Sequence, residues 1–146
     1  MRAIRLGDGA WDALQARTPI PAGLFVDVGG EGAHTGAINV NPSPIGSADG
    51  LVPGRAIPNH VAGSSTSIPL PDASVARLVL ERSTIEPGTG AEIARVMRPG
   101  GEVRIQTSMR GVLLHREILD AFEGARFVQR AVPGIYRHEM LTVARV

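Results

Sequence analysis

Residues 24–32 read Leu-Phe-Val-Asp-Val-Gly-Gly-Glu-Gly, a short apolar run followed by a turn with three glycines. An apolar run that stops at glycine is typical of a buried strand. Glycine lets the backbone turn sharply and approach a ligand closely. The stretch therefore predicts a central strand at Leu24–Val28 that ends in a candidate binding turn.

The rest of the chain alternates strand-like and helix-like segments. Residues 1–22 form an N-terminal lead-in with a helix at Asp8–Arg17, and the whole chain, 1–146, is predicted to be one domain. Strands and helices that alternate predict an α/β domain with a mostly parallel sheet, here closed by an antiparallel hairpin. The further predicted strands are Ala37–Val40, His60–Ala62, Ala76–Leu80, Glu102–Gln106, Phe127–Val132 and Met140–Val146, and the further helices are Thr89–Met97 and Val112–Phe122.

The connection between the first two predicted strands is too short for a helix. Only Gly29–Gly36 separates them, whereas a helical crossover needs a dozen or more residues. Eight extended residues reach about 26–29 Å, enough to return along a strand of about 17 Å. One face of the sheet would then lack its usual helix near the centre. We expect the long loop Pro42–Asn59, a second subunit of a homodimer or another partner to cover it.

Composition excludes several classes of function. The chain has 146 residues, 43% hydrophobic and 20% charged, with a formal charge of +1. It has no basic stripe and few aromatic residues, which disfavours nucleic acid and membrane partners. Cysteine is absent, as is lysine, so thiolate sites, Schiff bases and a phosphate-binding P-loop lysine are excluded. The four histidines lack metal-ligand spacing, and without a membrane span or signal peptide we expect a cytoplasmic protein.

Two later motifs carry a family resemblance. Residues 67–74 read Ser-Ile-Pro-Leu-Pro-Asp-Ala-Ser before a predicted strand, and residues 92–101 read Glu-Ile-Ala-Arg-Val-Met-Arg-Pro-Gly-Gly before the next. With the glycine turn, they resemble the class I S-adenosylmethionine-dependent methyltransferases, in which "LPF-pdnsFD" leads into the fourth strand and "E-xx-RVLkPGG" into the fifth. The resemblance runs from about Phe25 to the C-terminus. It implies a Rossmann-like methyltransferase, and separately we expect the protein to be bacterial.

The resemblance also assigns roles to residues. The predicted cofactor is S-adenosylmethionine, and its amino-acid end would lie against the turn, its ribose at the end of the second strand and its adenine after the third. The residues that would contact it are Asp27, Gly29, Gly30, Gly32 and His34 in or beside the turn, Asn41 at the ribose, and Ser64 and Ser65 at the adenine. Methyl transfer is an in-line displacement and depends mainly on placement, so a base is needed only when the acceptor must lose a proton. Glu81, after the strand at Ala76–Leu80, is the candidate catalytic base.

Several positions depart from the family pattern. Glu31 occupies the second glycine position of the turn, Asn41 replaces the acid that binds ribose, and Ala76 replaces the Asp that opens the fourth strand. Three interpretations stay open. The chain is a methyltransferase acting on a small molecule or protein, a methyltransferase-like binding or assembly module without catalysis, or a Rossmann-type domain for another nucleotide.

Overall fold

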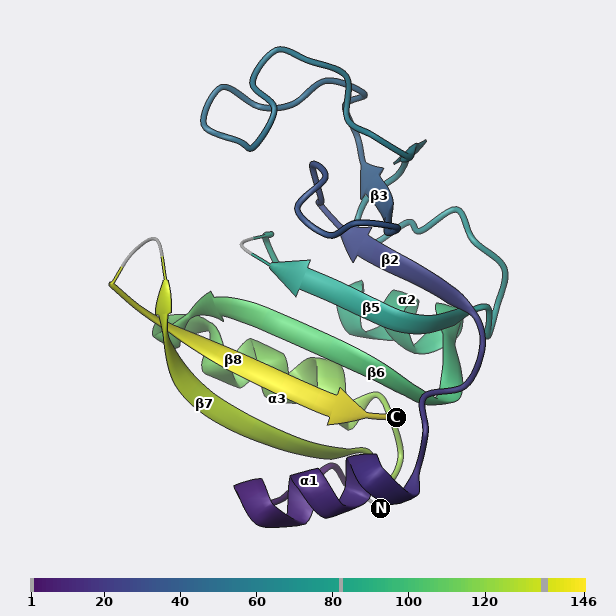
Figure 1. Cartoon of the computed structure of the whole chain (residues 1–146), viewed down its shortest axis with the longest axis vertical. Helices are drawn as coiled ribbons and strands as arrows, with labels where there is room; N and C mark the ends of the chain where they lie inside the picture. The colour runs from purple at the N-terminus through teal and green to yellow at the C-terminus, as the bar shows by residue number, and fades with distance from the viewer. Residues whose placement is uncertain (1, 82, 135–136) are drawn as a thin grey trace.

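A computed structural model describes residues 2–81, 83–134 and 137–146. In this part of the chain, eight strands form one sheet in the order β1-β7-β8-β6-β5-β2-β3-β4 (Figure 1). Strands β4, β3, β2, β5 and β6 pair in parallel, each with the next in this order. Strand β1 pairs in parallel with β7, and β8 is antiparallel to both β6 and β7. The bounds are β1 Ile4–Arg5, β2 Leu24–Val28, β3 Ile38–Asn41, β4 His60–Ala62, β5 Val75–Glu81, β6 Met97–Ser108, β7 Arg126–Gly134 and β8 Arg137–Arg145.

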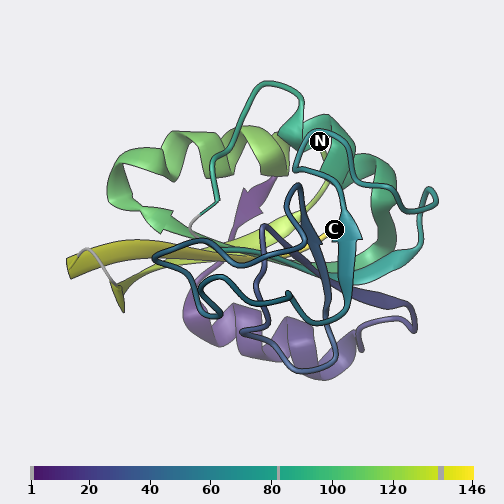
Figure 2. The same cartoon turned by 90° about the horizontal axis from the view of Figure 1, so that it is seen from above.

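Helices lie on both faces of the sheet but unequally. Helices α2 (Thr89–Val96) and α3 (Val112–Asp120) cover one face, and α1 (Asp8–Arg17) lies on the other (Figure 2). The main core is formed between α2, α3 and the centre of the sheet, where Leu78 and Leu80 of β5 pack with Ile93 of α2. On the other face, Trp11 of α1 packs only over the hairpin end of the sheet. The predicted mostly parallel α/β domain is therefore confirmed.

Most predicted elements begin or end one to three residues from the predicted bounds, β6 begins five residues earlier than predicted, and strand β1 is additional. Strand β1 was not predicted, because two residues carry no periodic pattern. Strand β6 begins at Met97 rather than Glu102, although a Pro-Gly-Gly run usually breaks a strand. The strand continues because neighbours pair with it. Met97 pairs with Val75, and the Gly100 N–H donates to the carbonyl of Val146 at 2.6 Å. Helix α3 ends two residues before the predicted Phe122.

The crossover from β2 to β3 contains no helix, as predicted. The sheet face above β2, β5 and β6 on the α1 side is instead polar, because side chains alternate along each strand. Leu78 and Leu80 point into the core, whereas Arg77 lies on the opposite face over the ring of Phe25, 4.8 Å from its centroid. The loop 42–59 lies beyond β3 and not in front of β5 and β6 (Figure 1). The prediction that the long loop covers this face is therefore wrong.

Candidate functional site

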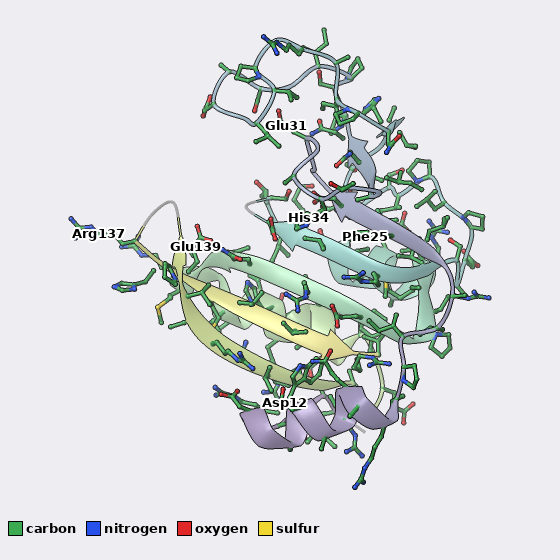
Figure 3. The ribbon with its side chains drawn as sticks, in the orientation of Figure 1. Asp12, Phe25, Glu31, His34, Arg137 and Glu139 are labelled. Atoms are coloured by element: carbon green, nitrogen blue, oxygen red, sulfur yellow. The ribbon has the colours of Figure 1, made fainter. Side chains whose placement is uncertain are left out.

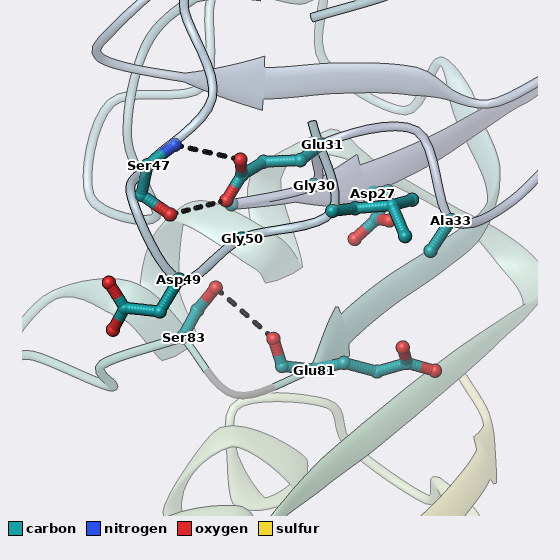
Figure 4. Close-up of a pocket in the computed structure, with 11 residues that line it drawn as sticks. Asp27, Gly30, Glu31, Ala33, Ser47, Asp49, Gly50, Glu81 and Ser83 are labelled. Carbon is teal, nitrogen blue, oxygen red and sulfur yellow. Dashed lines mark hydrogen bonds between the residues drawn. The ribbon is translucent and has the colours of Figure 1, made fainter. Parts of the chain in front are cut away.

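A cavity of about 540 Å³ lies where the strand order reverses. After β2 the chain adds β3 on one side, and β5 joins β2 on the other. In open parallel sheets, ligands bind outside the carboxyl ends of the strands at this reversal. The lining residues come from β2 and its turn, from the long loop and from the end of β5 (Figure 4): Asp27, Gly29, Gly30, Glu31, Ala33, Ser47, Asp49, Gly50, Leu51, Glu81 and Ser83.

Two glycines of the turn are required by its geometry. Gly29 has φ +76°, in the left-handed region, and a β-carbon there would collide with the hydroxyl of Ser83. That hydroxyl donates a hydrogen bond to the carbonyl of Val28 at 3.0 Å and so joins the ends of β2 and β5. A β-carbon on Gly30 would collide with the carboxyl group of Asp27. Backbone therefore faces the cavity at both positions.

Asn39 shapes the same turn and was not predicted. Its side chain is buried, its amide donates to the carbonyl of Pro58 at 2.7 Å, and its Oδ1 accepts from the N–H of Gly32 at 3.3 Å. The side chain thus connects the glycine turn to the end of the long loop. A polar residue inside the apolar run Ala37–Val40 was the sequence signal for it, because a buried amide needs partners.

Asp27 is the electrostatically unusual group of the site. The residue is 3% exposed, and among the described residues no donor hydrogen-bonds to its carboxylate. Burial raises its pKa to about 6, with His34 opposing the shift and Glu81 adding to it. A buried carboxyl that borders a cavity and has a raised pKa is a typical feature of a functional site.

Glu81 and His34 form a pair next to Asp27. Nε2 of His34 lies 3.2 Å from Oε1 of Glu81, and both side chains are partly exposed. The imidazole comes from the connection after the glycine turn and lies 6.0 Å from the ring of Phe25, measured between centroids. Both rings are on the face opposite α2 and α3 (Figure 3). Glu81 is therefore held at the cavity wall by a residue that itself lies outside the lining.

The residues predicted for ribose and adenine contact the protein itself. Asn41 lies at the end of β3, where its amide is 3.5 Å from the carbonyl of Gly29 and its Oδ1 accepts from the N–H of Ser43. The Ser65 hydroxyl is buried against the hydroxyl of Thr89, 3.0 Å away, and Ser64 pairs with Thr66. The structure brings Asp27, Gly29, Gly30 and Glu81 together at the cavity and leaves Gly32, His34, Asn41, Ser64 and Ser65 outside its lining.

The described residues contain no group of three or more His, Asp or Glu side chains arranged to hold a metal ion. Within the same residues, no helix has the length and apolar character needed to cross a bilayer.

Comparisons with known proteins agree on one fold. No protein-family model matches the chain. It is 32% identical to the malonyl-[acyl-carrier protein] O-methyltransferase of Serratia marcescens over 62% of this chain and 41% of that protein, so the match spans less than half of the relative's length. The structure of an S-adenosylmethionine-dependent methyltransferase from Thermotoga maritima superposes on this chain with a TM-score of 0.58 and 12% sequence identity. The superposition covers 94% of this chain and 95% of that one.

A 16S rRNA (adenine(1408)-N(1))-methyltransferase of Catenulisporales acidiphilia with its cosubstrate S-adenosylmethionine gives TM-score 0.54 at 15% identity, covering 97% of this chain and 91% of that one. The chain has the fold of the S-adenosylmethionine-dependent methyltransferases. The predicted Rossmann-like methyltransferase fold is confirmed. The connection from β2 to β3, residues 29–37, contains no helix in this chain.

Proposed function

We propose that the chain binds S-adenosylmethionine in the 540 Å³ cavity and transfers its methyl group. The observation that carries this proposal is the glycine turn with Asp27 behind it, at the reversal point of a methyltransferase fold. The amino-acid end of the cofactor would lie against Gly29 and Gly30, with its ammonium group toward Asp27. A cavity of this volume is within the range of about 300–1,000 Å³ that small-molecule sites occupy.

The charge of the cavity supports a cationic ligand. Four acidic residues are among its lining, Asp27, Glu31, Asp49 and Glu81, and no arginine is among the described lining residues. Sulfonium and ammonium groups are cations, and nearby carboxylates stabilise them most where water is partly excluded.

Glu81 is the residue placed to handle a proton. When bound, the cofactor supplies an electrophilic methyl group on a sulfonium. The carboxylate of Glu81 borders the cavity and can accept a proton from an acceptor hydroxyl or ammonium group. His34, 3.2 Å from that carboxylate and partly exposed, can pass the proton to solvent. The glycine turn fixes the position of one reactant, and placement supplies most of the acceleration in a displacement.

The proposed acceptor is a small molecule or a protein rather than a nucleic acid. The named relatives do not decide this, since one acts on a malonyl-acyl carrier protein and another on 16S rRNA. Electrostatics favours the proposal, because phosphates entering the cavity would meet a lining that includes the acidic residues Asp27, Glu31, Asp49 and Glu81.

Isothermal titration calorimetry tests the proposed function. We expect S-adenosylmethionine and S-adenosylhomocysteine to bind with dissociation constants within the range of about 1 μM to 1 mM typical of enzyme substrates. The Asp27→Asn variant should bind S-adenosylmethionine more weakly, and NAD and ATP should give no heat. Absence of heat with folded wild-type protein would contradict cofactor binding. Heat with NAD alone would favour the third interpretation.

A second function, a binding module without catalysis, is supported by one observation. The side chains predicted for ribose and adenine are engaged by the protein, as Asn41 is with Gly29 and Ser65 with Thr89. A module would give no heat with the cofactor, or heat without transfer. Transfer of a radiolabelled methyl group to small-molecule or protein fractions would exclude this second function.

A further inference from the structure

The long loop between β3 and β4 is folded onto itself. The N–H of Gly46 donates to the carbonyl of Arg55 at 2.8 Å, and that of Ile57 to the carbonyl of Pro44 at 2.9 Å. We call residues 44–57 the hairpin loop. Internal hydrogen bonds make it a compact unit, and its placement relative to the sheet depends on its contacts with the rest of the chain.

The tip of the hairpin loop has weak apolar anchoring. Leu51 at the tip is 60% exposed. At the base, Ile57 is buried and Ile45, which bridges to Ala56, is 50% exposed. Segments with few buried apolar contacts open locally at low cost in free energy. A polar contact that attaches the tip therefore has a large influence on its position.

Glu31 makes that contact. Its Oε1 accepts a hydrogen bond from the N–H of Ser47 and its Oε2 one from the Ser47 hydroxyl, both at 2.9 Å (Figure 4). Gly46 and Gly50 flank the carboxylate so closely that a β-carbon on either would collide with it. Hydrogen bonds to an ionised carboxylate are stronger than those between neutral groups. The hairpin loop is thus shaped to receive this one side chain.

The attachment determines one wall of the cavity. Ser47, Asp49, Gly50 and Leu51 line it from the hairpin loop, facing the turn and the end of β5. Resting on the proposed function, we infer that Glu31 is a positioning residue that holds the hairpin loop as a wall of the cofactor cavity. A side chain at a glycine position of the family pattern thereby acquires a role, because it reaches to the hairpin loop.

Two variants of Glu31 separate the attachment of the hairpin loop from the charge of the carboxylate. Glu31→Ala removes both hydrogen bonds. Glu31→Gln keeps them, because the amide oxygen still accepts from the Ser47 N–H and the amide nitrogen donates to the Ser47 hydroxyl. Asp12→Ala, which removes an exposed acid of α1, is the matched control for loss of a carboxylate.

The first measurement needs no ligand. Arg55 is exposed and is the only basic residue of the hairpin loop, so trypsin cleavage there reports opening and releases residues 56–146. Loss of hydrogen bonds to a charged group should increase the cleavage rate of Glu31→Ala about tenfold or more, while Glu31→Gln and Asp12→Ala cleave near the wild-type rate. Equal rates in wild type and Glu31→Ala would overturn the attachment.

The second measurement is calorimetry with S-adenosylhomocysteine. We expect Glu31→Ala to bind about tenfold more weakly and Glu31→Gln to stay within about threefold of wild type. Faster cleavage with unchanged affinity would overturn the role of the hairpin loop as a cavity wall. Absence of binding by wild type would refute the proposed function, and the inferred wall with it, while the cleavage rates still decide whether Glu31 attaches the hairpin loop.

Discussion

At the scale of single residues, the Asp27 carboxyl couples cofactor binding to pH. A cationic ligand favours the ionised form, and the pKa of about 6 in the free protein means that this form is lost as pH falls through that value. We therefore expect affinity for S-adenosylmethionine to be highest above pH 7 and to fall below pH 6, by about tenfold for each unit once the carboxyl is protonated. Calorimetry between pH 5 and 8 measures it. In Asp27→Asn the slope should disappear, and a slope retained by that variant would refute the assignment to Asp27.

Gly29 offers a separate test of the turn. An alanine there adds left-handed backbone strain and a collision with Ser83, whereas at Gly36, with φ +83°, a β-carbon would lie in open space. We expect Gly29→Ala to lower the free energy of unfolding by about 2–3 kcal/mol and Gly36→Ala by about 1 kcal/mol. Urea denaturation measures both. Equal losses would mean that the Ser83 contact contributes nothing.

The same residues show how far sequence could predict the site. Gly29, Gly30 and Asp27 were predicted from the glycine turn together with the resemblance of the two later motifs, and all three line the cavity. The attachment of Ser47 by Glu31 was not, because it joins segments 16 residues apart and depends on how the long loop folds. Asn39 was missed for a related reason, since its partner Pro58 lies 19 residues away.

At the scale of elements, Arg95 of α2 fastens the segment that precedes β5. Its guanidinium donates to the carbonyls of Ile68 and Leu70 at 2.7 and 2.9 Å and to the carboxylates of Glu92 and Asp72 at 2.6 and 2.7 Å. This contact joins residues 67–74 to residues 92–101, the two segments that carry the sequence resemblance.

Replacing Arg95 should loosen that segment. We expect Arg95→Ala to lower the thermal unfolding midpoint clearly, and Arg95→Lys to restore only part of it, because an ammonium group lacks the planar fork of donors. Arg110→Ala, an exposed arginine of the 3₁₀ helix Met109–Gly111, is the control. A midpoint for Arg95→Ala equal to that of Arg110→Ala would contradict the fastening role.

Elements were predicted best where composition alone defines them. The strands Leu24–Val28 and His60–Ala62 and the helix Asp8–Arg17 have the predicted bounds. The start of β6 was wrong because hydrogen bonds from Val75 and Val146 outweigh the local preference of a Pro-Gly-Gly run. Such pairing is tertiary and leaves no local trace in the sequence.

At the scale of the whole molecule, no helix of the described part of the chain lies over the face of the sheet in front of β5 and β6 (Figure 1). A homodimer or another partner covering it is still a prediction. The charged side chains of Arg77 and Arg104 there favour a polar interface. Sedimentation analysis measures the oligomeric state, and if copies pair through this face, Arg104→Glu should shift dimer to monomer. A wild type that is monomeric at high concentration would contradict the dimer.

The pH dependence of stability adds contributions from two buried groups, His115 and Asp27. His115 of α3 is fully buried and contacts the hydroxyls of Thr107 and Thr142, and burial lowers its pKa to about 4 from 6.5. Its contribution is present above pH 6.5 and lost as pH falls toward 4. Asp27 acts in the opposite direction, because its pKa is raised from 3.8 to about 6. Its contribution is present below pH 3.8 and lost as pH rises to 6. Each pKa shift changes the free energy of unfolding by about 3 kcal/mol at most.

Between pH 4 and 6 the two slopes therefore oppose each other. We expect the combined contribution of these two groups to wild-type stability to change little in this range. As pH falls, His115→Gln should become more stable relative to wild type, and Asp27→Asn should become less stable relative to wild type. Urea midpoints of the three proteins at each pH measure this, and differences between proteins at the same pH cancel the contributions of other carboxyls. Parallel curves for wild type and His115→Gln would show that His115 titrates normally. Since Asp27 borders the cavity and His115 does not, saturating S-adenosylmethionine should alter only the contribution of Asp27.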